Sequence, residues 1–243
     1  MHKILVTRPL EDYQRTADNL FKLGFAAIHA PMMVFKLKAF IKPDISQYSA
    51  LIFTSANGIR AIEKADCFSE IIKLPCYVVG AQTAEMAKKV GFKIFAKGAG
   101  DVNSLCDVII NDYRQRGMSA ALLHVSGLHK AGNLSRILKE AAIDVGSIHA
   151  YEMLEEGFIA EDIQRAFMGD DIKAILLYSP RSAKIFVKNI KKLGLLQNIS
   201  EIPTYCLSNN IAELLRKSYL KHIYFVEQPN EAALLNLLHK QLN

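Results

Sequence analysis

Cysteine is scarce in this chain, and its placement suits neither a metal site nor a disulfide framework. The 243 residues include four cysteines, Cys67, Cys76, Cys106 and Cys206, and no two of them form a Cys-x-x-Cys pair. We therefore expect four small buried side chains in a reducing compartment. The seven histidines form no His-Glu-x-x-His motif and no other i, i+4 pair, which argues against a zinc site. We expect no bound metal.

Long apolar runs are also absent. Only four residues separate Lys3 from Arg8, which is too short for the apolar region of a signal peptide. No run of about eighteen apolar residues occurs, so the sequence predicts no transmembrane helix and a cytoplasmic protein. A hydrophobic share of 51%, with 13 glycines and 7 prolines, excludes a disordered or collagen-like chain. The length allows one large domain or two small ones.

The motifs that mark nucleotide binding or hydrolysis are incomplete or missing. Gly98-Ala99-Gly100 begins like a dinucleotide-binding loop, but Asn103 stands where the third glycine should be. We interpret this segment as a strand-to-helix turn. No phosphate-binding P-loop and no Gly-x-Ser-x-Gly motif occur. The net charge of +6 suits an anionic ligand, but the basic residues are too scattered to indicate nucleic acid.

Short apolar runs, rich in β-branched residues, alternate with helical periods along the chain. Each run leads through a turn of small polar residues into an amphipathic segment, as in Leu51–Thr54, the turn Ser55–Gly58 and the helical Ile59–Ala65. Strands that are apolar on both faces and alternate with helices are typical of parallel sheets covered by helices, so we predict an α/β fold. The runs start at Ile4, Leu51, Tyr77, Leu122, Ile175 and Thr204.

The sequence also contains a weak internal repeat. Phe53-Thr54-Ser55 corresponds to Leu177-Tyr178-Ser179, and Gly80–Glu85 corresponds to Ser208–Glu213 at nearly the same offset. Matching segments in a fixed order indicate two similar α/β units. Periodicity alone does not exclude one long sheet.

Two segments could connect such units. Lys36–Pro43 and Glu152–Gly157 each follow a strand-like run, at opposite ends of the middle unit. If both are linkers, the middle unit is inserted into the outer one. Ile4–Thr7 must then pair in one sheet with Ile175–Tyr178 rather than with Leu51–Thr54. The expected parts are an outer domain of residues 1–36 and 155–243, an inserted domain of residues 40–150, and linkers at 36–40 and 151–155.

The turns that follow the strands are candidate anion sites. Open α/β folds bind ligands at the carboxyl ends of their strands, where helix N-termini offer free N–H groups and a partial positive charge. Several such turns without a nucleotide motif favour a multiply anionic ligand held across a cleft.

Four motifs, in order and at matching spacing, resemble those of the uroporphyrinogen-III synthase family over nearly the whole chain. They are Ile4–Pro9, Phe53–Gly58, Val78-Val79-Gly80 with Thr83-Ala84, and Ala150-Tyr151-Glu152. The resemblance implies two parallel-sheet α/β domains joined by a two-stranded linker, with the second domain inserted in the first. It also implies a cofactor-free cyclase for hydroxymethylbilane, a linear tetrapyrrole with eight carboxylates. The enzyme removes water, closes the ring and inverts the last pyrrole.

The resemblance further implies roles for single residues. Tyr151 corresponds to the family tyrosine suspected of protonating the departing hydroxyl, although a tyrosine here is also an ordinary packing residue. Arg8 either pairs with a substrate carboxylate or forms a salt bridge between domains. The backbone amides of Ser55 and Asn57 would hold a carboxylate, and Thr83 opens the next helix. The residues expected to bind substrate are Thr7, Arg8, Ser55, Asn57, Gly80, Thr83, Ser126, Lys130, Ser179, Arg181 and Ser208.

The chain departs from the family pattern at three turns. Ser208-Asn209-Asn210 stands where a Gly-x-Thr turn is usual, and Arg181 stands where a small residue is common. Ser126-Gly127, followed by Lys130, replaces an arginine–glycine turn. Arg181 and Lys130 would then supply charge that other members place differently.

Two other functions stay open at this point. A two-domain binding protein for an anionic small molecule would share the hinge and cleft, but a periplasmic one should carry a signal peptide. A nucleotide-dependent enzyme on a doubly wound sheet would need a complete glycine motif. We expect a monomer that binds neither nucleic acid nor membrane.

Overall fold

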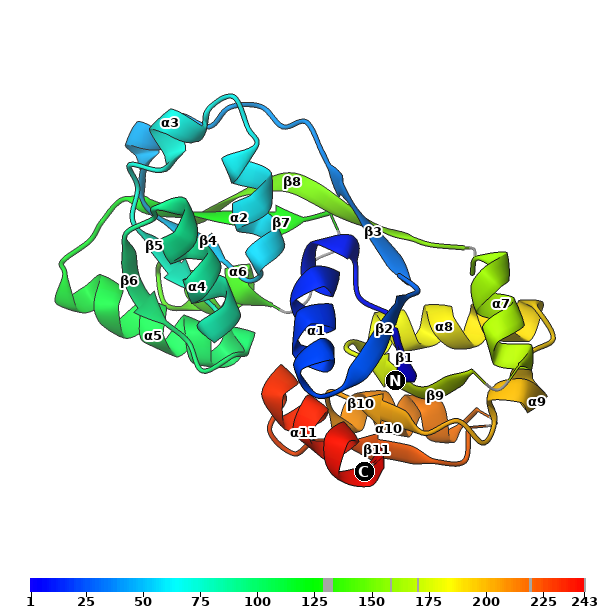
Figure 1. The fold of residues 1–243 in the computed structure, drawn as a ribbon. Coiled ribbons are helices and arrows are strands. Elements are labelled where there is room, and N and C mark those ends of the chain that lie inside the picture. The colour runs from blue at the N-terminus through cyan, green and yellow to red at the C-terminus, as the bar shows by residue number, and fades with distance from the viewer. Residues whose placement is uncertain (129–132, 158, 170, 219, 243) are drawn as a thin grey trace. The chain divides into compact units, whose positions relative to one another are not determined.

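The computed structural model describes residues 1–128, 133–157, 159–169, 171–218 and 220–242. The chain divides into two compact units (Figure 1). The first unit combines Met1–Phe35 with Leu154–Asn243, and the second unit is Lys36–Met153. Each unit contains a sheet of mostly or entirely parallel strands with helices packed on its faces.

The sheet of the first unit is entirely parallel and has the strand order β11-β10-β9-β1-β2. Leu5 pairs with Ile175 and Val6 with Leu176, so the predicted pairing of the first strand with the strand after the middle unit is confirmed. The strands are β1 (His2–Val6), β2 (Phe25–His29), β9 (Ile172–Leu177), β10 (Thr204–Cys206) and β11 (Ile223–Phe225).

Alternation along these strands builds an apolar core on each face of the sheet. Ile4 and Val6 belong to a buried cluster with Leu20 of α1 and Leu234 of α11. Leu5 lies in the other cluster, together with residues of α7, α8, α9 and α10. Burial on both faces explains the continuous apolar runs of the sequence. The helices are α1 (Leu10–Lys22), α7 (Glu161–Met168), α8 (Pro180–Lys192), α9 (Leu196–Ile199), α10 (Asn209–Arg216) and α11 (Glu231–Leu242).

The sheet of the second unit has the order β3-β8-β7-β4-β5-β6, and its strands from β8 to β6 are parallel. The strands are β3 (Met33–Leu37), β4 (Tyr48–Phe53), β5 (Cys76–Val78), β6 (Ile94–Lys97), β7 (Ala121–Gly127) and β8 (Val145–Glu155). The helices are α2 (Ala56–Glu63), α3 (Phe68–Ile71), α4 (Ala81–Val90), α5 (Val102–Gln115) and α6 (Leu134–Glu140), with a 3₁₀ turn at Ile45–Gln47.

Local signals place the helix ends of this unit. Gly91 ends α4 with a φ of 101°, a left-handed conformation that glycine adopts without steric cost. Asp101 begins α5, because its side chain accepts a hydrogen bond from the Ser104 amide at 2.9 Å. The glycine-containing segment before Asp101 is thus a strand-to-helix turn, as interpreted from the sequence.

The chain passes between the units in β3 and β8, since the divisions at Phe35/Lys36 and Met153/Leu154 fall inside these strands. The Lys38 amide donates to the Ala150 carbonyl at 2.9 Å, and the Glu156 amide donates to the Met32 carbonyl at 3.0 Å. Residue numbers therefore rise in opposite directions, and the two segments run antiparallel. The predicted linkers, residues 36–40 and 151–155, overlap this pair of strands, and their exact bounds stay a prediction.

All four cysteines are buried and unbridged, as expected from their spacing. Burial raises the pKa of the Cys76 and Cys206 thiols to about 12, so neither is a thiolate near neutral pH. Among the residues that the structure describes, no helix has the length and apolar character needed to cross a membrane.

Candidate functional site

The predicted site residues gather at the carboxyl ends of the parallel strands in each unit. In the first unit, Thr7 and Arg8 follow β1, Ser179 follows β9 and Ser208 follows β10. In the second unit, the corresponding positions are Ser55 and Asn57 after β4, Gly80 and Thr83 after β5, Ser126 at the end of β7, and Tyr151 in β8. Parallel strands end at a common edge, so each unit presents one polar edge of this kind.

Tyr151 and Ser55 form the central contact of the second unit's edge. The Tyr151 hydroxyl lies 2.8 Å from Ser55 Oγ, and the Tyr151 side chain is only 8% exposed. Burial raises the pKa of the phenol, while hydrogen bonding with Ser55 and with the Gly127 backbone acts in the opposite direction. The phenol is therefore protonated at neutral pH and can donate a proton.

Ser126 adjoins His149, which no motif of the sequence marked as a site residue. Ser126 Oγ lies 3.0 Å from Nδ1 of His149, and these two residues pair across β7 and β8. Thr54 Oγ1 lies 3.2 Å from Nε2 of the buried His124 in the same sheet. The sequence signal for His149 was its place two residues before Tyr151, on the same strand.

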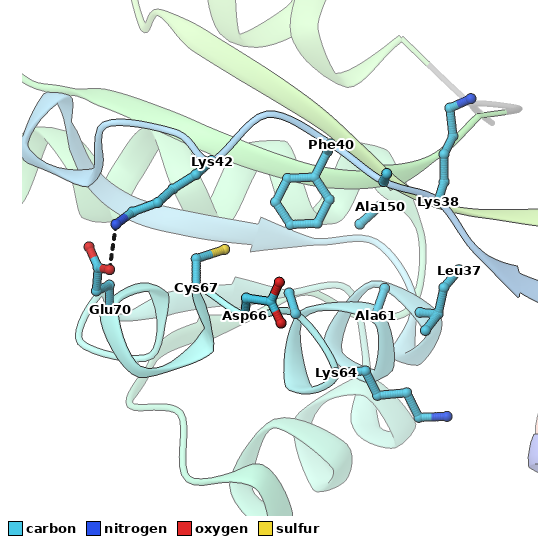
Figure 2. Close-up of a pocket in the computed structure, with 12 residues that line it drawn as sticks. Leu37, Lys38, Phe40, Lys42, Ala61, Lys64, Asp66, Cys67, Glu70 and Ala150 are labelled. Atoms are coloured by element: carbon cyan, nitrogen blue, oxygen red, sulfur yellow. Dashed lines mark hydrogen bonds and ion pairs between the residues drawn. The ribbon is translucent and has the colours of Figure 1, made fainter.

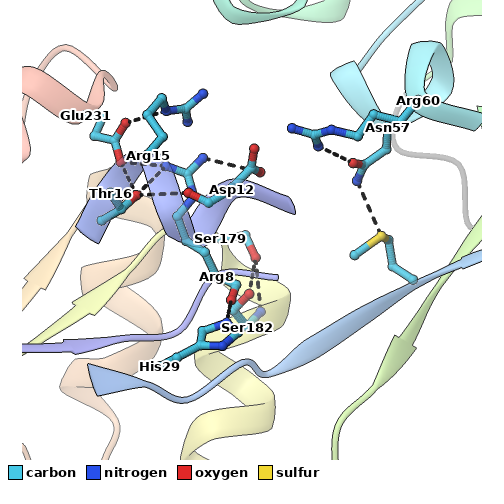
Figure 3. A network of polar contacts seen from close by, with 11 residues as sticks. Arg8, Asp12, Arg15, Thr16, His29, Asn57, Arg60, Ser179, Ser182 and Glu231 are labelled. Carbon is cyan, nitrogen blue, oxygen red and sulfur yellow. Dashed lines mark hydrogen bonds and ion pairs between the residues drawn. The ribbon is translucent and has the colours of Figure 1, made fainter. Parts of the chain in front are cut away.

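Asn57, Gly80 and Thr83 are held by contacts of their own. Asn57 Oδ1 accepts from Arg60 at 2.6 Å, and Asn57 Nδ2 lies 3.3 Å from the sulfur of Met153 (Figure 3). Gly80 begins α4, and its α-carbon faces the turn at Gly100, where a Cβ on Gly80 would lie 3.1 Å from the Gly100 Cα. Thr83 is the third residue of α4 and is buried in its first turn.

Arg8 is part of a buried ion-pair network in the first unit (Figure 3). Its Nη1 donates to Glu231 Oε1 at 2.8 Å, its Nη2 lies 3.5 Å from Asp12, and its guanidinium stacks over Tyr178 at 4.3 Å. Glu231 also accepts from Arg15 Nε at 3.0 Å. Arg8 and Glu231 are each 9% exposed. Both belong to the first unit, so the Arg8–Glu231 ion pair is not a salt bridge between domains, which was one of the two roles considered for Arg8.

The other predicted residues of the first unit lie at or just after the ends of β1, β9 and β10. Thr7 is fully buried and donates through Oγ1 to the Leu176 carbonyl at 2.7 Å. Ser179 caps α8 by accepting from the Ser182 amide at 3.0 Å, and Arg181 lies in the first turn of that helix. Ser208 begins α10 without a side-chain cap. Lys130 lies outside the described residues.

A separate pocket of about 500 Å³ lies in the second unit (Figure 2). Its walls are the second half of α2, the start of α3 and the segment 37–42, and a Lys42–Glu70 ion pair of 2.5 Å closes one side. None of the predicted site residues lines it. Within the described ranges, no three His, Cys, Asp or Glu side chains group closely enough to hold a metal ion.

Comparison with known proteins gives a family match over most of the chain. The family model described as uroporphyrinogen-III synthase HemD matches residues 14–236. The fold is similar to that of uroporphyrinogen-III synthetase from Helicobacter pylori 26695, at 18% identity over 100% of both chains and a TM-score of 0.69. A mutant uroporphyrinogen III synthase from the extremely thermophilic bacterium Thermus thermophilus matches at 15% identity, over 100% of this chain and 99% of that one, with a TM-score of 0.59.

These matches favour the synthase over the binding-protein alternative, and they agree with the two-unit α/β fold. The family match covers both units, including the turns described above from Ser55 to Ser208. The chain therefore belongs to the uroporphyrinogen-III synthase family, whose members are cyclising lyases of haem biosynthesis.

Proposed function

We propose that this chain closes hydroxymethylbilane to uroporphyrinogen III, and that the strand-to-helix turns of its two sheets bind the substrate. The observation that carries the proposal is the family match over residues 14–236. Within this range, the hydroxyl groups of Tyr151 and Ser55 lie 2.8 Å apart in the structure. We also propose that the protein acts as a cytoplasmic monomer without metal, cofactor or nucleic acid.

The reaction makes limited demands on the protein. The bilane also closes without an enzyme, but to the isomer in which the last pyrrole is not inverted. The protein must therefore fold the substrate, assist the loss of hydroxyl and control which carbon is attacked. Positioning and preorganised electrostatics suit this task better than a strong nucleophile.

We expect the substrate carboxylates to bind to backbone N–H groups at the N-termini of helices. Helices α2, α4, α8 and α10 each begin directly after a parallel strand, at Ser55, Gly80, Ser179 and Ser208. Each N-terminus carries the positive end of a helix dipole, and the first-turn N–H groups of a helix have no partner within the helix itself. At α8 the Ser182 amide already donates to Ser179. The net charge of +6 adds a general attraction for a substrate with eight carboxylates.

Tyr151 is the group we propose for proton donation. Its phenol stays protonated because burial raises its pKa, and Ser55 fixes the direction of the hydroxyl. Protonation of the departing hydroxyl would help water to leave, after which the folded substrate closes.

The isomer of the product tests the function. Hydroxymethylbilane is supplied to the purified protein, the products are oxidised, and the two uroporphyrin isomers are separated. We expect isomer III from the protein and the uninverted isomer from buffer alone. A second sample, treated with a chelator and dialysed, should keep the full rate. Only the uninverted isomer in the presence of folded protein would exclude the function, and a rate restored by added metal would exclude the metal-free mechanism.

Substrate affinity should fall as salt rises. Between about 0.01 M and about 0.1 M ionic strength, the screening length falls from about 30 Å to about 10 Å, which weakens attraction between carboxylates and the positively charged turns. We expect the Michaelis constant to rise severalfold over this range, while kcat at saturating substrate stays constant. Initial rates at several salt concentrations measure both values. A Michaelis constant that does not change would contradict binding by amides and cationic side chains.

A further inference from the structure

We propose that Gly127 is a positioning residue for Tyr151, because the absence of a side chain at Gly127 creates the space that holds the phenol against Ser55. The inference rests on the proposed function and adds a residue to it. Gly127 ends β7, and Tyr151 lies beside it on β8.

A shift in strand register brings the two residues together. Ser126 pairs with His149, whereas the next residue, Gly127, pairs with Tyr151. One extra residue, Ala150, is therefore accommodated on β8 at this point, as in a β-bulge. Without the shift, Ala150 would stand beside Gly127. Bulges of this type redirect a side chain at the end of a strand.

The ring of Tyr151 occupies the position that a side chain on residue 127 would need. A Cβ on Gly127 would lie 2.9 Å from Cε2 of Tyr151, 3.0 Å from Cζ and 3.4 Å from the hydroxyl oxygen. Gly127 has no positive φ, so its backbone conformation does not require glycine. Space for the ring is what distinguishes glycine from alanine here.

The same contact sets the position of the hydroxyl. Ser55 Oγ, directly before α2, lies 2.8 Å from the phenol oxygen, so a shift of the ring changes this hydrogen bond. The ring is almost fully buried, so a methyl group at residue 127 would displace the ring and the residues packed around it. We expect this displacement to move the phenol away from Ser55 and from the departing hydroxyl of the substrate.

Gly127→Ala should lower kcat about 10-fold to 100-fold, because a displacement of about 1 Å can cost a rate factor of that order. Gly146→Ala is the matched control. Gly146 lies on β8 next to the side chain of Tyr48, and a Cβ on Gly146 would lie 2.5–3.0 Å from that side chain. The steric clash is therefore similar, but Tyr48 is not a site residue. The control should lower the melting temperature and leave kcat within about twofold of wild type.

Kinetics in the Tyr151→Phe background separate positioning from general damage. If Gly127 acts through the phenol, Gly127→Ala should lower kcat no further once the hydroxyl is gone. The same fractional loss in both backgrounds, or wild-type kcat in Gly127→Ala, would overturn the proposal. A wild-type protein that makes only the uninverted isomer would instead overturn the proposed function, and the positioning role with it.

Folding is checked in parallel by thermal denaturation of every variant. If Gly127→Ala does not fold, the double variant Gly127→Ala/Tyr151→Ala should fold, because removal of the ring provides the space for the new methyl group. A double variant that stays unfolded would show that Gly127 is required for another reason, and the proposal would be wrong.

Discussion

Tyr151→Phe is expected to lower kcat about 100-fold while the product remains isomer III. General acid catalysis is usually worth about 10² to 10⁴ in rate. We expect the low end, because the bilane also cyclises without assistance, so that water or a substrate carboxyl can replace the phenol. A 100-fold loss corresponds to about 2.7 kcal/mol of transition-state stabilisation. Isomer choice should persist because it depends on how the substrate is folded.

The experiment measures rate and isomer ratio together, with Tyr48→Phe as the control. Tyr48 lies in β4 of the same sheet, and removal of its hydroxyl should leave kcat unchanged. Wild-type kcat in Tyr151→Phe would remove Tyr151 from the chemistry. A change to the uninverted isomer at an unchanged rate would make it a residue that positions the substrate instead.

The pH dependence of kcat gives an independent check on the same role. A proton donor must be protonated, and burial raises the pKa of Tyr151 above that of an ordinary tyrosine. The contribution of Tyr151 should therefore be constant through neutral and mildly alkaline pH and be lost only at higher pH. Tyr151→Phe should show no such alkaline loss.

Glu231→Ala is expected to lower the free energy of unfolding by about 3 kcal/mol. Glu231 accepts from Arg8 at 2.8 Å, from Arg15 at 3.0 Å and from the Thr16 hydroxyl, and both Arg8 and Glu231 are buried. Removing one partner of a buried ion pair leaves an uncompensated charge, at a cost of about 3–5 kcal/mol. We expect the low end because Asp12 still faces Arg8 at 3.5 Å.

The matched control is the exposed pair in the same unit. Lys3 and Asp171 are 3.1 Å apart, with side chains 46% and 54% exposed, so Asp171→Ala should cost no more than about 1 kcal/mol. Urea denaturation followed by far-UV circular dichroism measures both variants. Equal losses for the two would mean that the Arg8–Glu231 network does not stabilise the first unit as a buried pair should.

Much of the fold was predictable from local sequence. Runs such as Ile4–Thr7 and Ile175–Tyr178 are apolar at nearly every position, which indicates burial on both faces of a parallel sheet, and the structure pairs them. The turns after these runs carry the residue types that begin helices, and Ser179 caps α8. These features depend on neighbours within a few residues, so the sequence alone contains them.

The sequence by itself determined the α/β class, the order of its elements and the turns at which an anion could bind. Only the tertiary structure decided what those residues contact. Arg8 meets Glu231 across 223 positions of the chain, and Tyr151 meets Ser55 across 96. The space for Tyr151 over Gly127 depends on a one-residue shift between β7 and β8. A local register shift of this kind depends on how the neighbouring strand pairs, so the pattern of one strand alone does not reveal it.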